Sequence, residues 1–325
     1  MPIGCIIEGM WIALASILFS FSLGDFKLQN GQTLPDCRVT YRTFGTLNAD
    51  KSNVILIPTW YNGRSEDLAR FMGPGRLVDD NQYYVVVVDA LGNGSSSSPS
   101  NHSSVRGNSF PTITIRDMVE TQYQLLTRHL GLQRVHAVIG ISMGGMQVYE
   151  WMAAYPRFMA KAVPIVATPE MSEKDIRLWT SHFKILSRPG GGVEVGTDES
   201  GEEIPKEQEV KKTMLEQVMG MARQGMDMYR RFRDPFNPLK QFEAIRSHSI
   251  ARPFGNNLAE AGKRIQVPFL AIIASKDTAV SPDTPRSFSD SLGMPVLELD
   301  SECGHSSFKC EHYAIGAAVA KFLAN

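Results

Sequence analysis

One short motif constrains the fold of this chain more than any other feature. Residues 140–144 read G-I-S-M-G, which fits the pattern G-x-S-x-G, and an apolar run at 135–139 leads directly into it. The segment 146–154 that follows has helical character. A serine on a sharp strand-to-helix turn needs very small residues two positions before and after it, because the strained backbone leaves no room for larger ones. The motif therefore predicts a buried strand, a tight turn with Ser142 at its tip, and a helix that starts near Met143.

A serine held on such a turn points its hydroxyl out of the sheet, so Ser142 is the candidate nucleophile. A serine hydroxyl is a weak nucleophile at neutral pH, and it requires a general base and an anion that orients the base. In folds that place the nucleophilic serine on such a strand-to-helix turn, the acid and then the histidine follow the serine along the chain. Asp277 comes just after the apolar run 267–274, and His305 follows the last such run, 295–299. We therefore predict the triad Ser142, Asp277 and His305.

Other titratable side chains compete for these roles. After Asp277 the only histidines are His305 and His312, and His312 falls inside a predicted terminal helix, where a solvated or capping role is more natural. The acid has four rivals: Asp89, Asp283, Asp300 and Glu302. Asp283 follows Ser-Pro and is expected to cap the next helix, whereas Asp300 and Glu302 lie one loop too late. Asp89 ends a strand but precedes the serine, so we expect it to brace the neighbouring loops.

The oxyanion of an acyl-transfer intermediate needs two backbone donors. The residue after the nucleophile supplies one of them, so we predict the Met143 N–H. The second should come from the loop that follows the strand 53–58, and we choose Tyr61 because that loop must turn toward the serine there. Losing one such donor raises a reaction barrier by roughly 3 to 4 kcal/mol.

Alternating strands and helices predict a mostly parallel, doubly wound α/β sheet. The segments 26–28 and 38–44 alternate like antiparallel edge strands, and helices are expected at 115–130 and at about 308–323. Near-continuous apolar runs predict buried parallel strands at 53–58, 83–89, 162–167, 267–274 and 295–299. The long stretch from about 168 to 262, here called the cap, is predicted to be a helical insertion over the mouth at Ser142, because unstructured loops of that length are uncommon.

The domain boundaries follow from length and from the amino end. A chain of 325 residues with 43% hydrophobic content buries a substantial core, and we predict one domain over 25–325 that includes the cap. Residues 1–24 are apolar and short, like a secretory signal peptide, but they lack Lys and Arg and contain Glu8. The alternative is an N-terminal extension that packs on the domain. Accordingly, the location is secreted or periplasmic if 1–24 is a signal peptide, and otherwise cytoplasmic.

Charge and cysteine content limit the classes of binding partner and cofactor that the sequence predicts. The formal net charge is −1, with 33 basic and 34 acidic side chains interspersed, so no basic field for nucleic acid and no membrane-binding patch is expected. No stable membrane span is predicted, and the expected partner is a small molecule. Two cysteines, Cys303 and Cys310, flank His305; a local disulfide is one reading, and two free, partly buried thiols are the favoured one. Metal-ligand spacings are missing from the sequence, so we predict no metal and no organic cofactor.

With the triad placed, the chain resembles an α/β-hydrolase of the homoserine O-acetyltransferase-like family. The resemblance rests on the segments 47–56, 110–119 and 142–147. It implies an α/β-hydrolase fold in which a serine takes an acetyl group from acetyl-CoA and passes it to the hydroxyl of homoserine. Those roles would fall on Ser142, Asp277 and His305.

The chain departs from that family at two places. An aspartate usually follows the histidine, whereas Ser306 stands here, and the basic cap segment has no closer counterpart than Arg230, Arg231 and Arg233. A zwitterionic acceptor would then have poorly paired charges in a buried pocket. We therefore predict an esterase that cleaves a small acyl ester through an acyl-enzyme, with water as acceptor. The alternatives are an O-acetyltransferase and a catalytically inactive binding protein; oligomeric state stays open, with a homodimer as one option.

A methionine stripe within the cap also has two readings. Methionines at 214, 219, 221, 226 and 228 would either line an adaptable acyl pocket or, more ordinarily, form the core of the cap.

Overall fold

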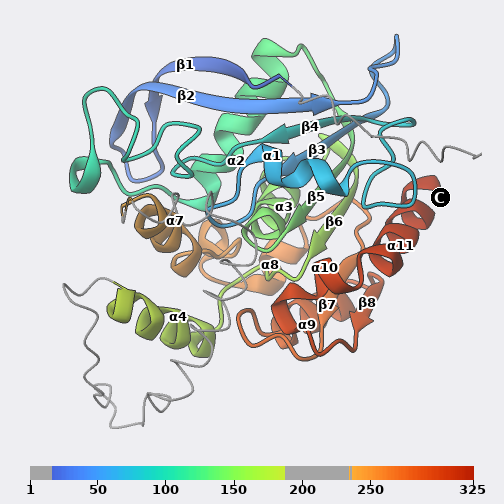
Figure 1. The fold of residues 1–325 in the computed structure, drawn as a ribbon. Helices are drawn as coiled ribbons and strands as arrows, with labels where there is room; N and C mark the ends of the chain where they lie inside the picture. Colours follow the sequence, from blue (N-terminus) through green and yellow to red (C-terminus); the bar gives the residue numbers. More distant parts are fainter. Residues whose placement is uncertain (1–16, 187–233, 235) are drawn as a thin grey trace, which may run out of the picture.

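An eight-stranded, mostly parallel sheet forms the centre of the molecule in the computed structural model, which describes residues 17–186, 234 and 236–325 (Figure 1). The strands are β1 (Phe19–Lys27), β2 (Thr33–Phe44), β3 (Val54–Pro58), β4 (Tyr84–Val88), β5 (Val135–Ile141), β6 (Met159–Ile165), β7 (Ala271–Ala274) and β8 (Val296–Leu299). Their spatial order is β1-β2-β4-β3-β5-β6-β7-β8. The β1–β2 and β2–β4 pairs are antiparallel and all other pairs are parallel. The predicted α/β class and the antiparallel edge are thus confirmed.

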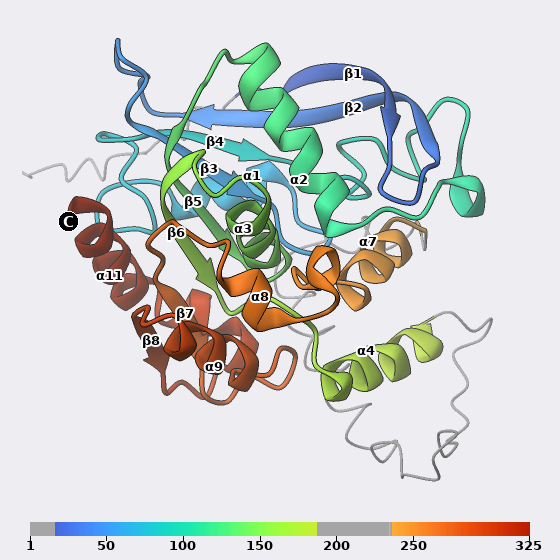
Figure 2. The same cartoon turned by 180° about the vertical axis from the view of Figure 1, so that it is seen from behind.

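Both faces of the sheet are buried along β3, β4, β5 and β7, as the continuous apolar runs predicted, whereas most of β1 and β8 is partly or fully exposed. Successive residues of a strand point to opposite faces, so β3 and β4 divide their side chains between two core clusters. Val54, Leu56, Val86 and Val88 belong to the cluster under α2 (Ile115–Gln124), α3 (Met143–Ala154) and α9 (Asp283–Ser291). Ile55, Ile57, Val85 and Val87 belong to the cluster under α1 (Ser65–Leu68), α10 (Ser307–Cys310) and α11 (His312–Ala324). Opposite views show these two helical layers on either side of the sheet (Figures 1 and 2).

The helices of the two layers include those predicted at 115–130, from near Met143 and at about 308–323. They are α1 (Ser65–Leu68), α2 (Ile115–Gln124), α3 (Met143–Ala154), α8 (Leu258–Gly262), α9 (Asp283–Ser291), α10 (Ser307–Cys310) and α11 (His312–Ala324), with short turns η1 (Ala69–Phe71), η2 (Gly107–Ser109), η3 (Leu125–His129), η4 (Arg252–Phe254) and η5 (Gly304–Ser306). Thr114 caps α2, since its side chain accepts a hydrogen bond from the Asp117 N–H and its own N–H donates to the Asp117 carboxylate. The helix expected at 115–130 is wider in its last turn, η3, and the expected terminal helix is interrupted at Glu311.

Two helices of the predicted cap lie beyond the edge at which the parallel strands end, here called the carboxyl edge. They are α4 (Glu173–Leu186) and α7 (Phe236–Arg246), and Figure 1 shows them side by side below this edge. The two chain segments that leave and re-enter the core are joined at their base: Met171 N–H donates to His248 O at 3.2 Å, and Ile250 N–H donates to Pro169 O at 3.1 Å. The methionines at 214–228 and the arginines at 230, 231 and 233 lie outside the described residues. The cap boundaries and the nature of residues 1–24 stay predictions, although β1 already begins at Phe19.

Asp89 braces the loops at the carboxyl edge, as expected. It is completely buried directly after β4, and its carboxylate accepts hydrogen bonds from the Thr40 hydroxyl, the Ser65 N–H and hydroxyl, and the Asn93 amide at 2.8 to 3.0 Å. Burial raises the pKa of this carboxyl above its usual range, and the four hydrogen bonds oppose that effect. Three separate segments of the chain are thereby tied to the end of one strand.

Candidate active site

Ser142 lies at the turn between β5 and α3, in a conformation that few residues adopt. Its backbone has φ 55° and ψ −123°. Ser142 N–H donates to Ile165 O at 2.9 Å, which continues the β5–β6 ladder, and Ser142 O accepts from Met146 N–H at 3.0 Å, which starts the helix. The turn leaves no room for a side chain at either glycine of the motif, as predicted. A Cβ on Gly140 would collide with the Gly144 backbone, and one on Gly144 would lie 2.6 Å from Pro58 O.

The structure brings the three predicted triad side chains together in one hydrogen-bonded series. His305 Nε2 lies 2.9 Å from Ser142 Oγ, and His305 Nδ1 lies 2.7 Å from Asp277 Oδ2. A carboxylate only accepts hydrogen bonds, so in the neutral imidazole Nδ1 carries the proton and Nε2 accepts from the serine hydroxyl. This is the tautomer in which a histidine can take the serine proton.

The loop after β7 fixes the orientation of Asp277. Its second oxygen, Oδ1, accepts hydrogen bonds from the Ala279 N–H at 2.8 Å and the Val280 N–H at 3.0 Å. The Asp277 side chain is 2% exposed, whereas that of His305 is 25% exposed. The acid is therefore inaccessible to water, while the histidine can reach both the serine and solvent.

The rival residues have other partners. Asp300 and Glu302 pair with Lys276 at the exposed surface. Asp283 is in the first turn of α9 and pairs with Arg286 at 3.1 Å. His312 Nδ1 lies 2.9 Å from Lys309 O at the start of α11.

The loop from Pro58 to Gly63 approaches the serine turn, as the choice of Tyr61 required. Thr59 O accepts from the Gln147 side chain of α3 at 3.1 Å, and Gly63 N–H donates to Trp60 O at 3.0 Å. Between these anchors, the backbone N–H groups of Trp60 and Tyr61 donate to no group in the described part of the chain. Both are thus available as donors, and the sequence argument selected only the second.

Sequence reasoning missed two residues of the cap that contact the acid loop. The Trp179 indole N–H on α4 donates to Ala279 O at 2.6 Å, and the same ring packs edge-on against Tyr61. Asp175, also on α4, accepts from the Ser281 N–H at 3.3 Å. Burial, and to a smaller extent Asp277, raises the pKa of Asp175. Helical periodicity places these residues on one helix, but nothing in the sequence says which loop that helix meets.

The cysteines that flank His305 are bonded to each other. Cys303 and Cys310 form a disulfide with a Cα–Cα distance of 6.6 Å, and both residues are exposed. The expectation of two free, partly buried thiols is therefore wrong; a spacing of seven residues lets η5 and α10 fold the chain back on itself. Cys37 is a buried free cysteine, and burial raises the pKa of its thiol to about 12.

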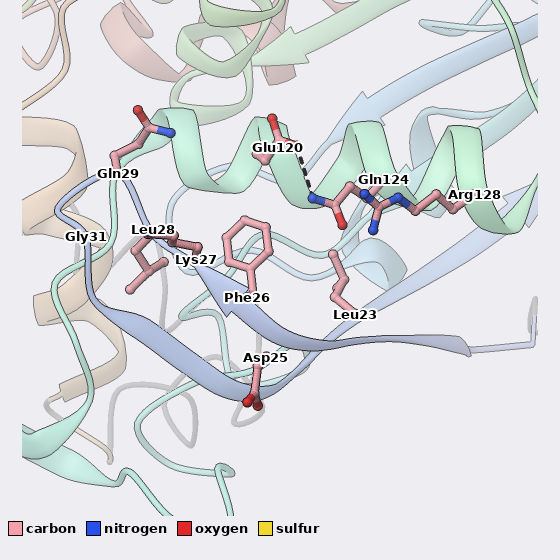
Figure 3. A pocket seen from close by; sticks show the side chains of 10 residues that line it. All are labelled: Leu23, Asp25, Phe26, Lys27, Leu28, Gln29, Gly31, Glu120, Gln124 and Arg128. Atoms are coloured by element: carbon pink, nitrogen blue, oxygen red, sulfur yellow. Dashed lines mark hydrogen bonds between the residues drawn. The ribbon is translucent and has the colours of Figure 1, made fainter.

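A separate cavity of about 550 Å³ lies between the β1–β2 hairpin and α2 (Figure 3). Its lining includes Phe26 and Leu28 as well as side chains of both charge signs, among them Lys27, Glu120 and Arg128. None of the triad residues lines it. Within the described residues, no group of three or more histidine, cysteine or acidic side chains is arranged to hold a metal ion. Among those same residues, no helix is both long and apolar enough to cross a bilayer.

Known proteins resemble this chain in sequence and in structure. An ethyl acetate hydrolase from Pseudomonas veronii is 42% identical over 156 residues, 47% of this chain and 45% of the relative. A homoserine O-acetyltransferase from Methanohalophilus mahii is 28% identical over 347 residues, 92% of this chain and 70% of the relative. The chain spans about half the length of the first curated relatives it matches. The resemblance to homoserine O-acetyltransferases is thus confirmed.

The fold agrees with solved structures. An acetylester hydrolase from Corynebacterium glutamicum superposes with a TM-score of 0.82 at 24% identity, covering 95% of this chain and 96% of that one. Residues 53–310 match the family described as the alpha/beta hydrolase fold. That match covers most of the chain, including the serine turn and both other triad residues. The chain therefore belongs to the alpha/beta hydrolase fold family.

Proposed function

We propose that this protein is a serine esterase that hydrolyses small acyl esters through an acyl-enzyme on Ser142. The observation that carries the proposal is the hydrogen-bonded series from Asp277 through His305 to Ser142, with 2.7 and 2.9 Å between the heavy atoms. In that series each group has the partner that its role requires. The ethyl acetate hydrolase among the relatives supports a small acyl ester as the substrate class.

The proposed reaction has two halves. Ser142 Oγ attacks the ester carbonyl carbon while His305 Nε2 takes the hydroxyl proton; the tetrahedral intermediate then collapses, and the alcohol leaves with that proton. In the second half, Nε2 takes a proton from water as the water oxygen attacks the acyl-enzyme. The carboxylic acid departs and Ser142 regains its proton. Asp277 holds the imidazole in the required tautomer and stabilises it when charged.

The oxyanion of both intermediates would be held by the Met143 N–H and by a donor of the Pro58–Gly63 loop. Met143 is the first residue of α3, where backbone N–H groups lack intrahelical partners. Tyr61 is our choice for the second donor, with the Trp60 N–H next to it as the rival. Burial raises the pKa of the Tyr61 hydroxyl, so that side chain stays neutral at ordinary pH.

Acyl transfer to an alcohol is the second candidate function. It is favoured by the similarity to a homoserine O-acetyltransferase over 92% of the chain. Against it, the residue after His305 is the exposed Ser306, so no carboxylate stands there to pair with the amino group of an amino-acid acceptor. Water needs no such partner. The homodimer and the lack of a nucleic-acid partner stay predictions.

The test is a panel of acetyl to octanoyl p-nitrophenyl esters with ethyl acetate, assayed with the wild type and Ser142→Ala. We expect the substitution to lower kcat by more than about 10⁴-fold, because all covalent chemistry is lost. Adding homoserine should not change the rate of acid release. Acetyl-CoA-dependent formation of O-acetylhomoserine that outruns hydrolysis would replace the esterase with the transferase, and full activity of Ser142→Ala would contradict both.

A further inference from the structure

One buried glutamine of the cap reaches into the core, and no catalytic argument uses it. Gln241 is on α7, in the inserted segment, yet its side chain is completely buried. Its Oε1 accepts the Asn62 N–H at 2.7 Å, and its Nε2 donates to Leu91 O at 2.9 Å. One amide group of the cap thus joins the loop after β3 to the loop after β4.

The partner on the first loop is next to the candidate oxyanion donors. Asn62 follows Tyr61 directly, and its backbone has φ 55°, in the left-handed region that asparagine tolerates better than most other non-glycine residues. The hydrogen bond from Asn62 N–H to Gln241 fixes the peptide plane between Tyr61 and Asn62. The neighbouring N–H groups of Trp60 and Tyr61, which have no acceptor in the described residues, are then held in one direction.

Among the described residues, no other side chain makes a hydrogen bond to the backbone in the middle of the loop, where the remaining contacts are the turn bond from Gly63 N–H to Trp60 O and ring packing such as that of Trp179 on Tyr61. At its start, Thr59 O is held by Gln147 of α3 and Thr59 Oγ1 accepts from the Ala90 N–H at 3.0 Å. At its end, Gly63 O accepts from Asn93 Nδ2 at 2.9 Å. Among the described residues, Gln241 is the side chain that hydrogen-bonds to the backbone between these two ends, and it comes from the cap.

We infer that Gln241 is a positioning residue for the oxyanion hole, so that the inserted cap completes the site by orienting the N–H donors of the Trp60–Tyr61 segment toward the carbonyl oxygen of the substrate. Preorganised donors stabilise the transition state more than the bound ester, so their loss should act on kcat rather than on KM. This inference rests on the proposed esterase function.

A matched control is available on the same helix. Asn237 is one turn earlier on α7 and is also buried; its side chain joins Ser100, with Asn237 Nδ2 donating to Ser100 Oγ at 2.8 Å and the Ser100 N–H donating to Asn237 Oδ1 at 3.1 Å. It ties α7 to the core as Gln241 does, but makes no bond to the Pro58–Gly63 loop. A purely structural effect of loosening α7 should therefore appear in both positions.

The experiment compares Gln241→Met, Gln241→Glu and Asn237→Ala in the full chain. We measure kcat and KM on p-nitrophenyl acetate and the Ki of a trifluoromethyl ketone, which forms a tetrahedral adduct with the serine. Gln241→Met should lower kcat about 10- to 100-fold and leave KM within about threefold of the wild type. It should raise the Ki of the ketone by the same factor by which it lowers kcat/KM. In Gln241→Glu a protonated carboxyl presents the same acceptor and donor, so activity should stay within about threefold of the wild type.

Among the kinetic results for Gln241→Met and Asn237→Ala, two would overturn the inference. One is a folded Gln241→Met variant with unchanged kcat; the other is an Asn237→Ala variant that loses kcat and ketone affinity equally. Amide hydrogen exchange at Asn62, whose N–H donates to Gln241, gives a readout that does not depend on activity, and it should speed up in Gln241→Met alone. An inert wild type would sink the esterase proposal, whereas unchanged exchange in Gln241→Met would sink the positioning role by itself. If Gln241→Met does not fold, a Gln241→Glu variant that loses kcat while Asn62 exchange stays slow contradicts the inference.

Discussion

Two aspartates at the carboxyl edge of the sheet show how the same side chain takes different roles. Asp89 follows β4 and Asp277 follows β7, and both are buried. The hydrogen bonds to both carboxylate oxygens of Asp89 come from hydroxyl, amide and backbone donors. Asp277 uses one oxygen in the same way, but its other oxygen faces His305. The role of each aspartate follows from the group that hydrogen-bonds to its second carboxylate oxygen.

Asp89 should therefore matter for stability before it matters for catalysis. We expect Asp89→Ala to lower the free energy of unfolding by about 2 to 4 kcal/mol, because several buried donors lose their acceptor. Asp89→Asn should cost less, since the hydroxyls of Thr40 and Ser65 can turn to accept from an amide. Urea denaturation measures both. The control is Asp300→Ala, which removes an exposed pair with Lys276 and should change stability by less than about 1 kcal/mol; equal losses at all three would contradict the assignment.

At the scale of elements, the disulfide encloses the turn that presents His305. The bond between Cys303 and Cys310 joins the start of η5 to the end of α10, which are seven residues apart in sequence. His305 is inside this closed loop, and its two ring nitrogens must reach Asp277 and Ser142 at once. A loop that frays would lose both contacts.

We expect the double substitution Cys303→Ser, Cys310→Ser to lower thermal stability and kcat together. Closing a loop this short stabilises the folded protein by about 2 to 3 kcal/mol on chain-entropy grounds. The kcat should fall several-fold because His305 spends less time in contact with both Asp277 and Ser142. Because both cysteines are exposed, wild type treated with dithiothreitol should behave like the variant. A reduced wild type with unchanged kcat and melting temperature would show that η5 and α10 hold the histidine without the bond.

Sequence patterns predicted those parts of the site that depend on local structure. The serine turn follows from two glycines and a strand, and the order of acid and histidine follows from the ends of two later strands. The contacts made by the cap did not follow from any pattern. Gln241 meets Asn62 across 179 residues and Trp179 meets Ala279 across 100, and such pairs depend on how an insertion packs, which periodicity does not encode. The sequence did not decide whether Cys303 and Cys310 are bonded, because their spacing also fits two free thiols.

At the scale of the whole molecule, the stability of the cap depends on the place where its two ends meet the core. His248 is part of this junction: it is buried, its Nε2 lies 3.1 Å from Thr168 O, and its own carbonyl accepts from Met171. Burial lowers the pKa of His248 from 6.5 to about 3; the hydrogen bond to Thr168 opposes this shift, and the nearby Arg252 adds to it. The folded protein therefore keeps this imidazole neutral at pH values where the unfolded chain protonates it.

The sign of the pH dependence follows from that difference. Because the folded pKa is depressed, the contribution of His248 to stability is complete above pH 6.5 and is lost as the pH falls from 6.5 to about 3, by on the order of a few kcal/mol. Buried carboxyls such as Asp89 and Glu150, whose pKa values are raised, act in the opposite sense, since their contribution is lost as the pH rises. The wild-type profile sums both, so the test is a difference: His248→Gln keeps a donor for Thr168 O but does not titrate. Urea midpoints from pH 8 to 4 should fall more steeply for the wild type than for His248→Gln. Parallel curves for the two proteins would mean that the junction opens, or that His248 takes up a proton, without a loss of folding free energy.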